Sequence, residues 1–138
     1  SGDAILAVEA LGAEGVQIGT LFALAAESSA SDEFKCLCTS LNEGDTMLCL
    51  KKISPTRLVK NTLYAKVAEA EAAGADADAL RTIMGKAASK RGIFEGDVEN
   101  GEIEIGQIAS AVKSIDTVAD IFARLNREYN ERLSCLIK

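Results

Sequence analysis

The chain has 138 residues, of which 48% are hydrophobic and 4% aromatic, and its formal net charge is −6. This length suits one domain, and an acidic chain with no Lys/Arg stripe interleaved with aromatic residues argues against a nucleic-acid-binding surface. No apolar run approaches the roughly 18 residues of a membrane span and no signal-peptide pattern is present, so we expect a cytoplasmic protein without a membrane partner.

The absence of histidine limits the chemistry of this chain. Without His, the commonest general base and the commonest partner of cysteine in mixed metal sites are both missing. The four cysteines are Cys36, Cys38, Cys49 and Cys135, and the Cys36-Leu37-Cys38 spacing does not fit a CxxC motif. We therefore predict small buried thiols in a reducing compartment, no metal site and no catalytic residue.

The first predicted elements are a helix and a short strand. Asp3 is predicted to cap a helix whose inner positions are Ile5, Val8 and Leu11. Val16–Ile18 then predicts a buried strand, which normally lies in a parallel sheet beside others of its kind. No second strand–helix unit follows, so we expect its neighbouring strands to precede residue 1.

Gln17 to Thr20 form the first candidate binding segment. Gly19 has no Cβ, so an oxyanion such as phosphate can approach its main-chain N–H directly, and Thr20 adds a hydroxyl and a second N–H. A helix starting here would add a partial positive charge. A Gly-Thr pair after a strand is usually only a turn, so this pattern by itself favours a turn over a phosphate site.

The next predicted elements are a short helical turn over 21–26 and a longer helix that Ser31 caps. The inner face of that helix carries Phe34, Leu37, Cys38 and Leu41. Thr46–Lys51 is predicted to be extended. Arg57–Asn61 either pairs with it or leads directly into the next helix. For Arg57 itself, the sequence favours a salt bridge over an anion contact.

Two more helices are predicted before an irregular stretch. The first runs to about Ala73, and Asp76 caps a second one that Gly85 ends. Lys86 to Gly106 is rich in glycine and acidic residues and predicts turns.

A short helix and a long one are predicted after residue 106. Gln107 follows a glycine at the start of the short helix, where its side chain and backbone can both reach a ligand, although this pattern alone is weak. The last helix begins near Asp116. Its predicted inner residues are Val118, Ile121, Phe122, Leu125, Tyr129 and Leu133.

Five stretches of the sequence occur in one order: residues 11–22, Ala26-Glu27-Ser28, Pro-Thr-Arg-Leu-Val-Lys-Asn at 55–61, Phe-Glu-Gly-Asp-Val at 94–98 and Gly-Gln-Ile at 106–108. This order resembles the carboxy-terminal part of the nitronate monooxygenase (2-nitropropane dioxygenase) family. Flavin-type enoyl-acyl-carrier-protein reductases belong to the same group. The resemblance covers essentially the whole chain.

The resemblance implies an α/β fold that is helix-rich and incomplete as given: the carboxy-terminal segment of an FMN-binding TIM (β/α)8 barrel with a mostly helical inserted lobe. Residues 1–30 would be the last helix–strand unit of the barrel. Residues 31–101 would be the inserted lobe that covers the site and forms part of the substrate pocket. Residues 102–138 would be the return segment and the carboxy-terminal helix.

The resemblance also implies the candidate cofactor residues. Gln17, Ile18, Gly19 and Thr20 match the motif that holds the FMN phosphate at the carboxyl end of a barrel strand. Gln107 lies in the segment that returns towards the flavin. The family's catalytic histidine belongs to earlier strands, so we expect this chain to be a fragment or one of two subunits. Alone, we expect it to bind FMN weakly or not at all.

Three functions remain open at this point. The parent protein is an FMN-dependent oxidoreductase that oxidises alkyl nitronates, or it is an enoyl-thioester reductase with a nicotinamide donor. Alternatively, the chain is a non-catalytic helical binding or assembly module. The expected partners are a small-molecule substrate and either the missing amino-terminal half of the barrel or a second copy of the chain.

Overall fold

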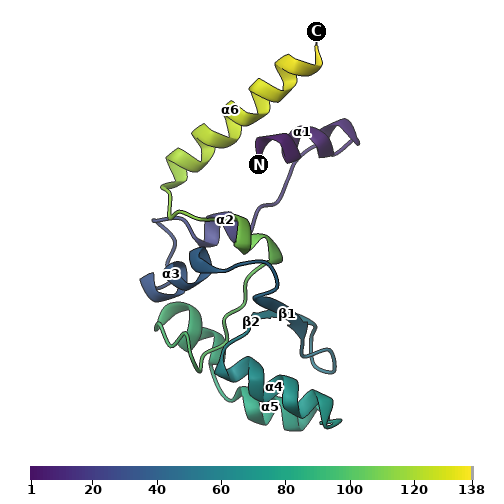
Figure 1. Ribbon diagram of the computed structural model, residues 1–138, viewed down its shortest axis with the longest axis vertical. Helices are drawn as coiled ribbons and strands as arrows, with labels where there is room; N and C mark the ends of the chain where they lie inside the picture. Colours follow the sequence, from purple (N-terminus) through teal and green to yellow (C-terminus); the bar gives the residue numbers. More distant parts are fainter. Residues whose placement is uncertain (138) are drawn as a thin grey trace.

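The computed structural model describes residues 1–137, which form an elongated molecule with helices at one end and a β-hairpin with two helices at the other (Figure 1). Short helices occupy the middle. In chain order the elements are α1 (Gly2–Ala10), α2 (Thr20–Ala23), α3 (Asp32–Ser40), β1 (Thr46–Cys49), β2 (Thr56–Val59), α4 (Thr62–Ala72), α5 (Ala77–Met84), the π-helical turn η1 (Lys90–Phe94), the 3-10 helix η2 (Gln107–Ala111) and α6 (Val118–Leu136).

Of the two alternatives that the sequence leaves open for residues 57–61, the structure shows the first, in which the segment around Arg57 pairs with the strand before it. β1 and β2 are antiparallel, and Leu48 lies opposite Arg57. A third segment joins the free edge of β2: the Val59 N–H donates to Ile103 O at 2.9 Å, and the Ile105 N–H donates to Arg57 O at 3.3 Å. These bonds fix the return segment beside the strand that carries Arg57.

Helices α4 and α5 pack against one face of the hairpin. Asp76 caps α5 as predicted, because its Oδ1 accepts the Ala79 N–H at 2.9 Å. Asn61 caps α4 by accepting the Tyr64 N–H at 3.0 Å. The buried residues shared by the hairpin and these helices are Cys49, Leu50, Leu58, Leu63, Val67, Leu80, Met84 and Ala88.

A second buried cluster connects α2, α3 and η2 with the other face of β2. Ser31 caps α3 as predicted, its Oγ accepting the Phe34 N–H at 3.2 Å. Lys35 is buried on the same helix, and its Nζ donates to Ala26 O at 3.1 Å and to Ser28 O at 3.0 Å. This lysine ties the chain that follows α2 to α3. The cluster consists of Leu24, Phe34, Cys38, Leu41, Val59, Ile103, Ile105 and Ala109.

Helices α1 and α6 lie against each other at the far end of the molecule (Figure 1). Ser1, and not Asp3, caps α1, since Asp3 instead pairs with Arg132 of α6 at 2.7 Å. The predicted inner positions of α1 are mostly wrong: Leu6 is buried, whereas Val8 and Leu11 are exposed. The reason is that α1 turns its Leu6 side, and not the predicted stripe, towards α6.

Helix α6 follows the predicted pattern in part. Ile121 and Leu125 are buried, as the spacing predicts. Phe122 is 55% exposed, although its ring lies 5.5 Å from that of Phe22. The buried part of the stripe packs against residues of α1 and of the segment around α2, and the rest of it meets solvent.

The predicted strand over Val16–Ile18 is not formed, since residues 15–19 are neither helix nor strand and Val16 is 44% exposed. A strand needs a hydrogen-bonding neighbour, and within residues 1–137 no other strand lies beside this segment.

The prediction of four buried cysteines is also wrong for Cys36 and Cys135, which are exposed. None of the helices in residues 1–137 has both the length and the apolar composition that crossing a membrane requires.

Candidate functional site

Thr20 and Gly106 meet at the start of α2, although they belong to opposite ends of the chain. A Cβ added to Gly106 would lie 2.5 Å from Thr20 Oγ1. The backbone of Gly106, with φ −67° and ψ 153°, is one that any residue adopts. A side chain at position 106 would therefore have to displace Thr20 Oγ1, so this glycine is favoured by space and not by conformation. The structure thus brings together the two segments that the sequence analysis singled out for a cofactor.

The backbone of Gly19 and Thr20 is exposed to a potential ligand. Gly19 occupies the N-cap of α2 without a side-chain capping bond. Among residues 1–137 no acceptor takes the N–H of Gly19 or of Thr20. A Cβ placed on Gly19 would meet nothing within 4 Å. Two neighbouring N–H donors are therefore without a protein acceptor among residues 1–137, and such donors can bind an oxyanion.

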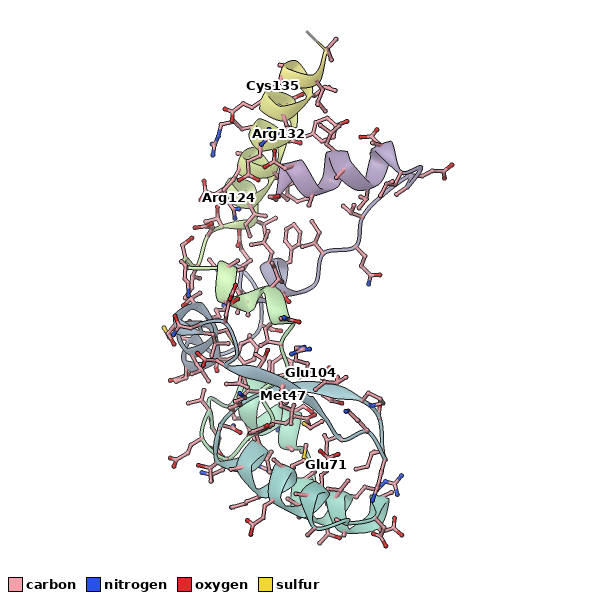
Figure 2. The ribbon with its side chains drawn as sticks, turned by 45° about the vertical axis from the view of Figure 1, so that its right-hand side comes forward. Met47, Glu71, Glu104, Arg124, Arg132 and Cys135 are labelled. Atoms are coloured by element: carbon pink, nitrogen blue, oxygen red, sulfur yellow. The ribbon has the colours of Figure 1, made fainter. Side chains whose placement is uncertain are left out.

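A cavity of about 390 Å³ lies over this point, between α2 and the hairpin. Its walls include Gly19, Thr20, Arg57, Glu104 and Gly106. Figure 2 shows Glu104 between the hairpin and the helices in the middle of the molecule. The cavity is therefore lined by segments from the beginning, the middle and the end of the chain, and it carries one cationic and one anionic side chain.

The other candidate residues line neighbouring cavities. Gln17 and Ile18 line one of about 570 Å³, which also includes Thr20 and Ile108. Gln107 lines a separate cavity of about 620 Å³, together with Ile108. The structure thus groups Gln17, Ile18, Gly19 and Thr20, and it places Gln107 next to them but facing a different space.

Arg57 does not form the salt bridge that the sequence favours. Among residues 1–137 no carboxylate pairs with its guanidinium; instead Nη1 donates to Thr46 O at 3.4 Å and to Thr46 Oγ1 at 3.3 Å. The expectation fails because the strand register places Leu48 opposite Arg57, and the guanidinium reaches diagonally to Thr46, which pairs with Val59.

Sequence reasoning missed Glu104 and the contribution of Ile108. Ile103, Glu104 and Ile105 alternate between apolar and polar residues, which is the pattern of an extended segment. That pattern places Glu104 on the face opposite its two buried neighbours, which are 1% and 6% exposed. It does not reveal which cavity that face borders.

Among residues 1–137 no three carboxylate or thiol groups gather as metal ligands do.

The sequence profile of nitronate monooxygenases matches residues 1–128, which is most of the chain. The chain belongs to the nitronate monooxygenase family. This is a family of flavin-dependent oxidoreductases. A search of curated protein sequences finds no match.

The structure of this family member is similar to that of FabK from Thermotoga maritima. The two chains share 28% sequence identity with a TM-score of 0.87 over 99% of this chain and 43% of FabK. A methionine-to-alanine variant of FabK gives 27% identity and a TM-score of 0.78, over 99% of this chain and 41% of the variant. The chain therefore spans less than half the length of the FabK chains that it matches.

Proposed function

We propose that this chain is the carboxy-terminal part of an FMN-dependent oxidoreductase of the nitronate monooxygenase type, and that it supplies part of the FMN phosphate site and the substrate lobe. The approach of Thr20 to Gly106 carries this proposal. It joins the two most specific motifs of the family, from distant parts of the chain, around donors that have no partner among residues 1–137. The match to under half of FabK supports the assignment to one part of a longer protein.

In this proposal residues 1–30 belong to the last helix–strand unit of a TIM barrel, 31–101 form the inserted lobe and 102–138 return to the barrel. Exposed apolar side chains at the α1 end, Val8, Leu11 and Val16, then contact the rest of the barrel. A strand at 16–18 forms only when those neighbouring strands complete the sheet.

The residues of this chain bind and position, and none of them is proposed to transfer a proton. The Gly19 and Thr20 N–H groups and the Thr20 hydroxyl fit a phosphate by number and type of donor. Gln17, Ile18 and Gln107 line the adjoining space. When bound, the flavin supplies the redox chemistry by accepting electrons from the substrate. The hairpin, which belongs to the proposed lobe, borders the cavity through Arg57.

A second candidate is an enoyl-acyl-carrier-protein reductase with a flavin and a nicotinamide donor. The TM-score of 0.87 with FabK, a flavin enoyl-acyl-carrier-protein reductase, favours it. The two candidates share the flavin site, so residues 17–20 do not distinguish them. Their substrates differ: a nitronate is a small anion, whereas an enoyl thioester is a long neutral chain with a carrier.

The test uses the full-length protein that contains this chain. We expect a flavin absorption spectrum that extraction identifies as FMN, together with oxygen uptake on addition of an alkyl nitronate. Consumption of NAD(P)H with a crotonyl thioester and no nitronate oxidation would establish the second candidate. Failure to retain or bind any flavin would overturn both.

The isolated chain tests the alternative of a non-catalytic helical module. If the chain is part of a barrel, light scattering should show association, because the apolar residues of α1 meet solvent. Its FMN affinity should then be weak or absent. A monodisperse monomer with a cooperative thermal transition would favour the helical module, and tight FMN binding by this monomer would contradict the assignment to one part of a site.

A further inference from the structure

Arg57 lines the cavity that it shares with Gly19 and Thr20, and among residues 1–137 no carboxylate pairs with its guanidinium. It is half-buried on β2, and its hydrogen bonds to Thr46, both through Nη1, are long, at 3.3 and 3.4 Å. A guanidinium has five N–H donors. Most of its donors therefore have no protein acceptor within residues 1–137.

Four other arginines of the chain form ion pairs, whereas Arg91 donates to Lys86 O and, among residues 1–137, pairs with no carboxylate. Arg81 pairs with Asp78, Arg127 with Glu131 and Arg132 with Asp3. Arg124 pairs with Asp116 and, at 3.9 Å, with Glu128. In this acidic chain with a net charge of −6, carboxylates are plentiful, yet none pairs with Arg57 among residues 1–137. The cationic group is available for a ligand that enters the cavity.

We propose that Arg57 binds an oxyanion in this cavity together with the backbone of Gly19 and Thr20. This inference deepens the proposed function and rests on it for the identity of the ligand. The guanidinium fork matches two oxygens of a phosphate or of a planar nitronate, and such charge-assisted bonds are the strong ones. The oxyanion is the phosphate of the flavin or the anionic substrate.

Glu104 sets a limit on the shape of this site. Its carboxylate also lines the cavity, is exposed and forms no ion pair with Arg57. An anion bound between Arg57 and α2 is therefore stabilised by the guanidinium and by the N–H groups of Gly19 and Thr20. The carboxylate of Glu104 repels an anion that lies against the return segment. The geometry thus favours an oxyanion that lies close to α2 over one that lies against the return segment.

The experiment compares Arg57→Met, Arg57→Lys and the control Arg81→Met in the full-length protein. R81M removes the same charge from an exposed surface pair. Binding of FMN, riboflavin and inorganic phosphate is measured by flavin fluorescence and by ³¹P line width, and KM is measured for an alkyl nitronate. Thermal melting identifies a variant that does not fold, and R57K keeps the charge should R57M unfold.

If Arg57 holds the flavin phosphate, R57M weakens FMN binding about tenfold or more and leaves riboflavin binding unchanged. If it holds the substrate, both flavin affinities are unchanged and KM for the nitronate rises by a similar factor. Agreement of R57M with R81M within about twofold in every measurement overturns the inference. If the wild type binds no flavin, the proposed function fails, and loss of phosphate binding in R57M alone still decides the inference.

Discussion

Thr20 Oγ1 occupies the space that a side chain on Gly106 would need, 2.5 Å from the position of its Cβ. This contact joins the start of α2 to the start of η2, and it aligns the two segments that border the proposed phosphate site. Because the site depends on this approach, changes at either residue should alter stability and binding together.

The first prediction concerns Gly106→Ala. The added methyl group collides with Thr20, so G106A should lower the free energy of unfolding by about 1–3 kcal/mol, which urea denaturation measures. Thr20→Ala removes the colliding hydroxyl, and the double variant G106A/T20A should be no less stable than T20A. Strict additivity of the two changes would contradict the steric explanation.

Gly19→Ala should affect binding without affecting the fold. A methyl group there meets no atom within 4 Å, and φ is −87°, so the stability change should stay within about 0.5 kcal/mol. The methyl group nevertheless enters the space that the phosphate needs, so in the full-length protein FMN affinity should fall about tenfold or more while riboflavin affinity stays constant.

The matched control for that variant is Gly15→Ala. Gly15 also has no atom within 4 Å of an added Cβ, and it lies in the same connection but outside the Arg57 cavity. G15A should bind FMN as the wild type does. Equal FMN affinities for G19A and G15A would show that Gly19 does not contact the phosphate.

Asn61 should contribute more to stability than an ordinary helix cap. Besides capping α4, its Nδ2 donates to Val98 O and to Gly101 O, both at 2.9 Å. Asn61→Ala should therefore cost about 2 kcal/mol or more, against about 1 kcal/mol for Asp76→Ala, whose side chain makes only the capping bond among residues 1–137. Denaturant midpoints compare the two variants.

Asn61→Asp separates the two roles of this side chain. It keeps the capping oxygen but replaces the amide donor with a carboxylate that faces two carbonyl oxygens. We expect N61D to be at least as unstable as N61A at neutral pH. A stability close to that of the wild type would mean that the cap alone matters.

The buried cysteines predict a loss of stability in alkali. Burial raises the pKa of Cys38 from 9.0 to about 12. Burial, with smaller contributions from Glu71 and Glu102, raises the pKa of Cys49 to about 11. Because the thiols lose their protons at lower pH in the unfolded chain than in the folded one, alkali favours unfolding. The free energy of unfolding keeps its full value below pH 9.0 and falls as the pH rises through the pKa values of the folded thiols.

A thiol reagent and one variant check this prediction. At pH 8 a disulfide reagent should modify the exposed Cys36 and Cys135 rapidly, and it should reach Cys38 and Cys49 only after unfolding. Cys49→Ala should show a shallower fall in unfolding free energy between about pH 9 and 11 than the wild type. Rapid modification of all the thiols in the native protein would contradict their burial.

The sequence by itself determined those features of this protein that depend on residues close together in the chain. Ser31 and Asp76 cap their helices as predicted, because a capping side chain bonds to an N–H only three residues further on. The family motifs are also contiguous runs of residues, so the amino-acid order alone indicates the segment 17–20 and residue 107 as cofactor candidates.

Only the tertiary structure decided which residues meet. The strand expected at 16–18 depends on hydrogen bonds from other strands, and residues 1–137 supply none beside it. The salt bridge expected for Arg57 is replaced by contacts across the hairpin, and the approach of Thr20 to Gly106 depends on the packing of α2 against η2. Local hydrogen bonds are encoded within a few residues, whereas contacts between distant segments follow from the burial of the whole chain.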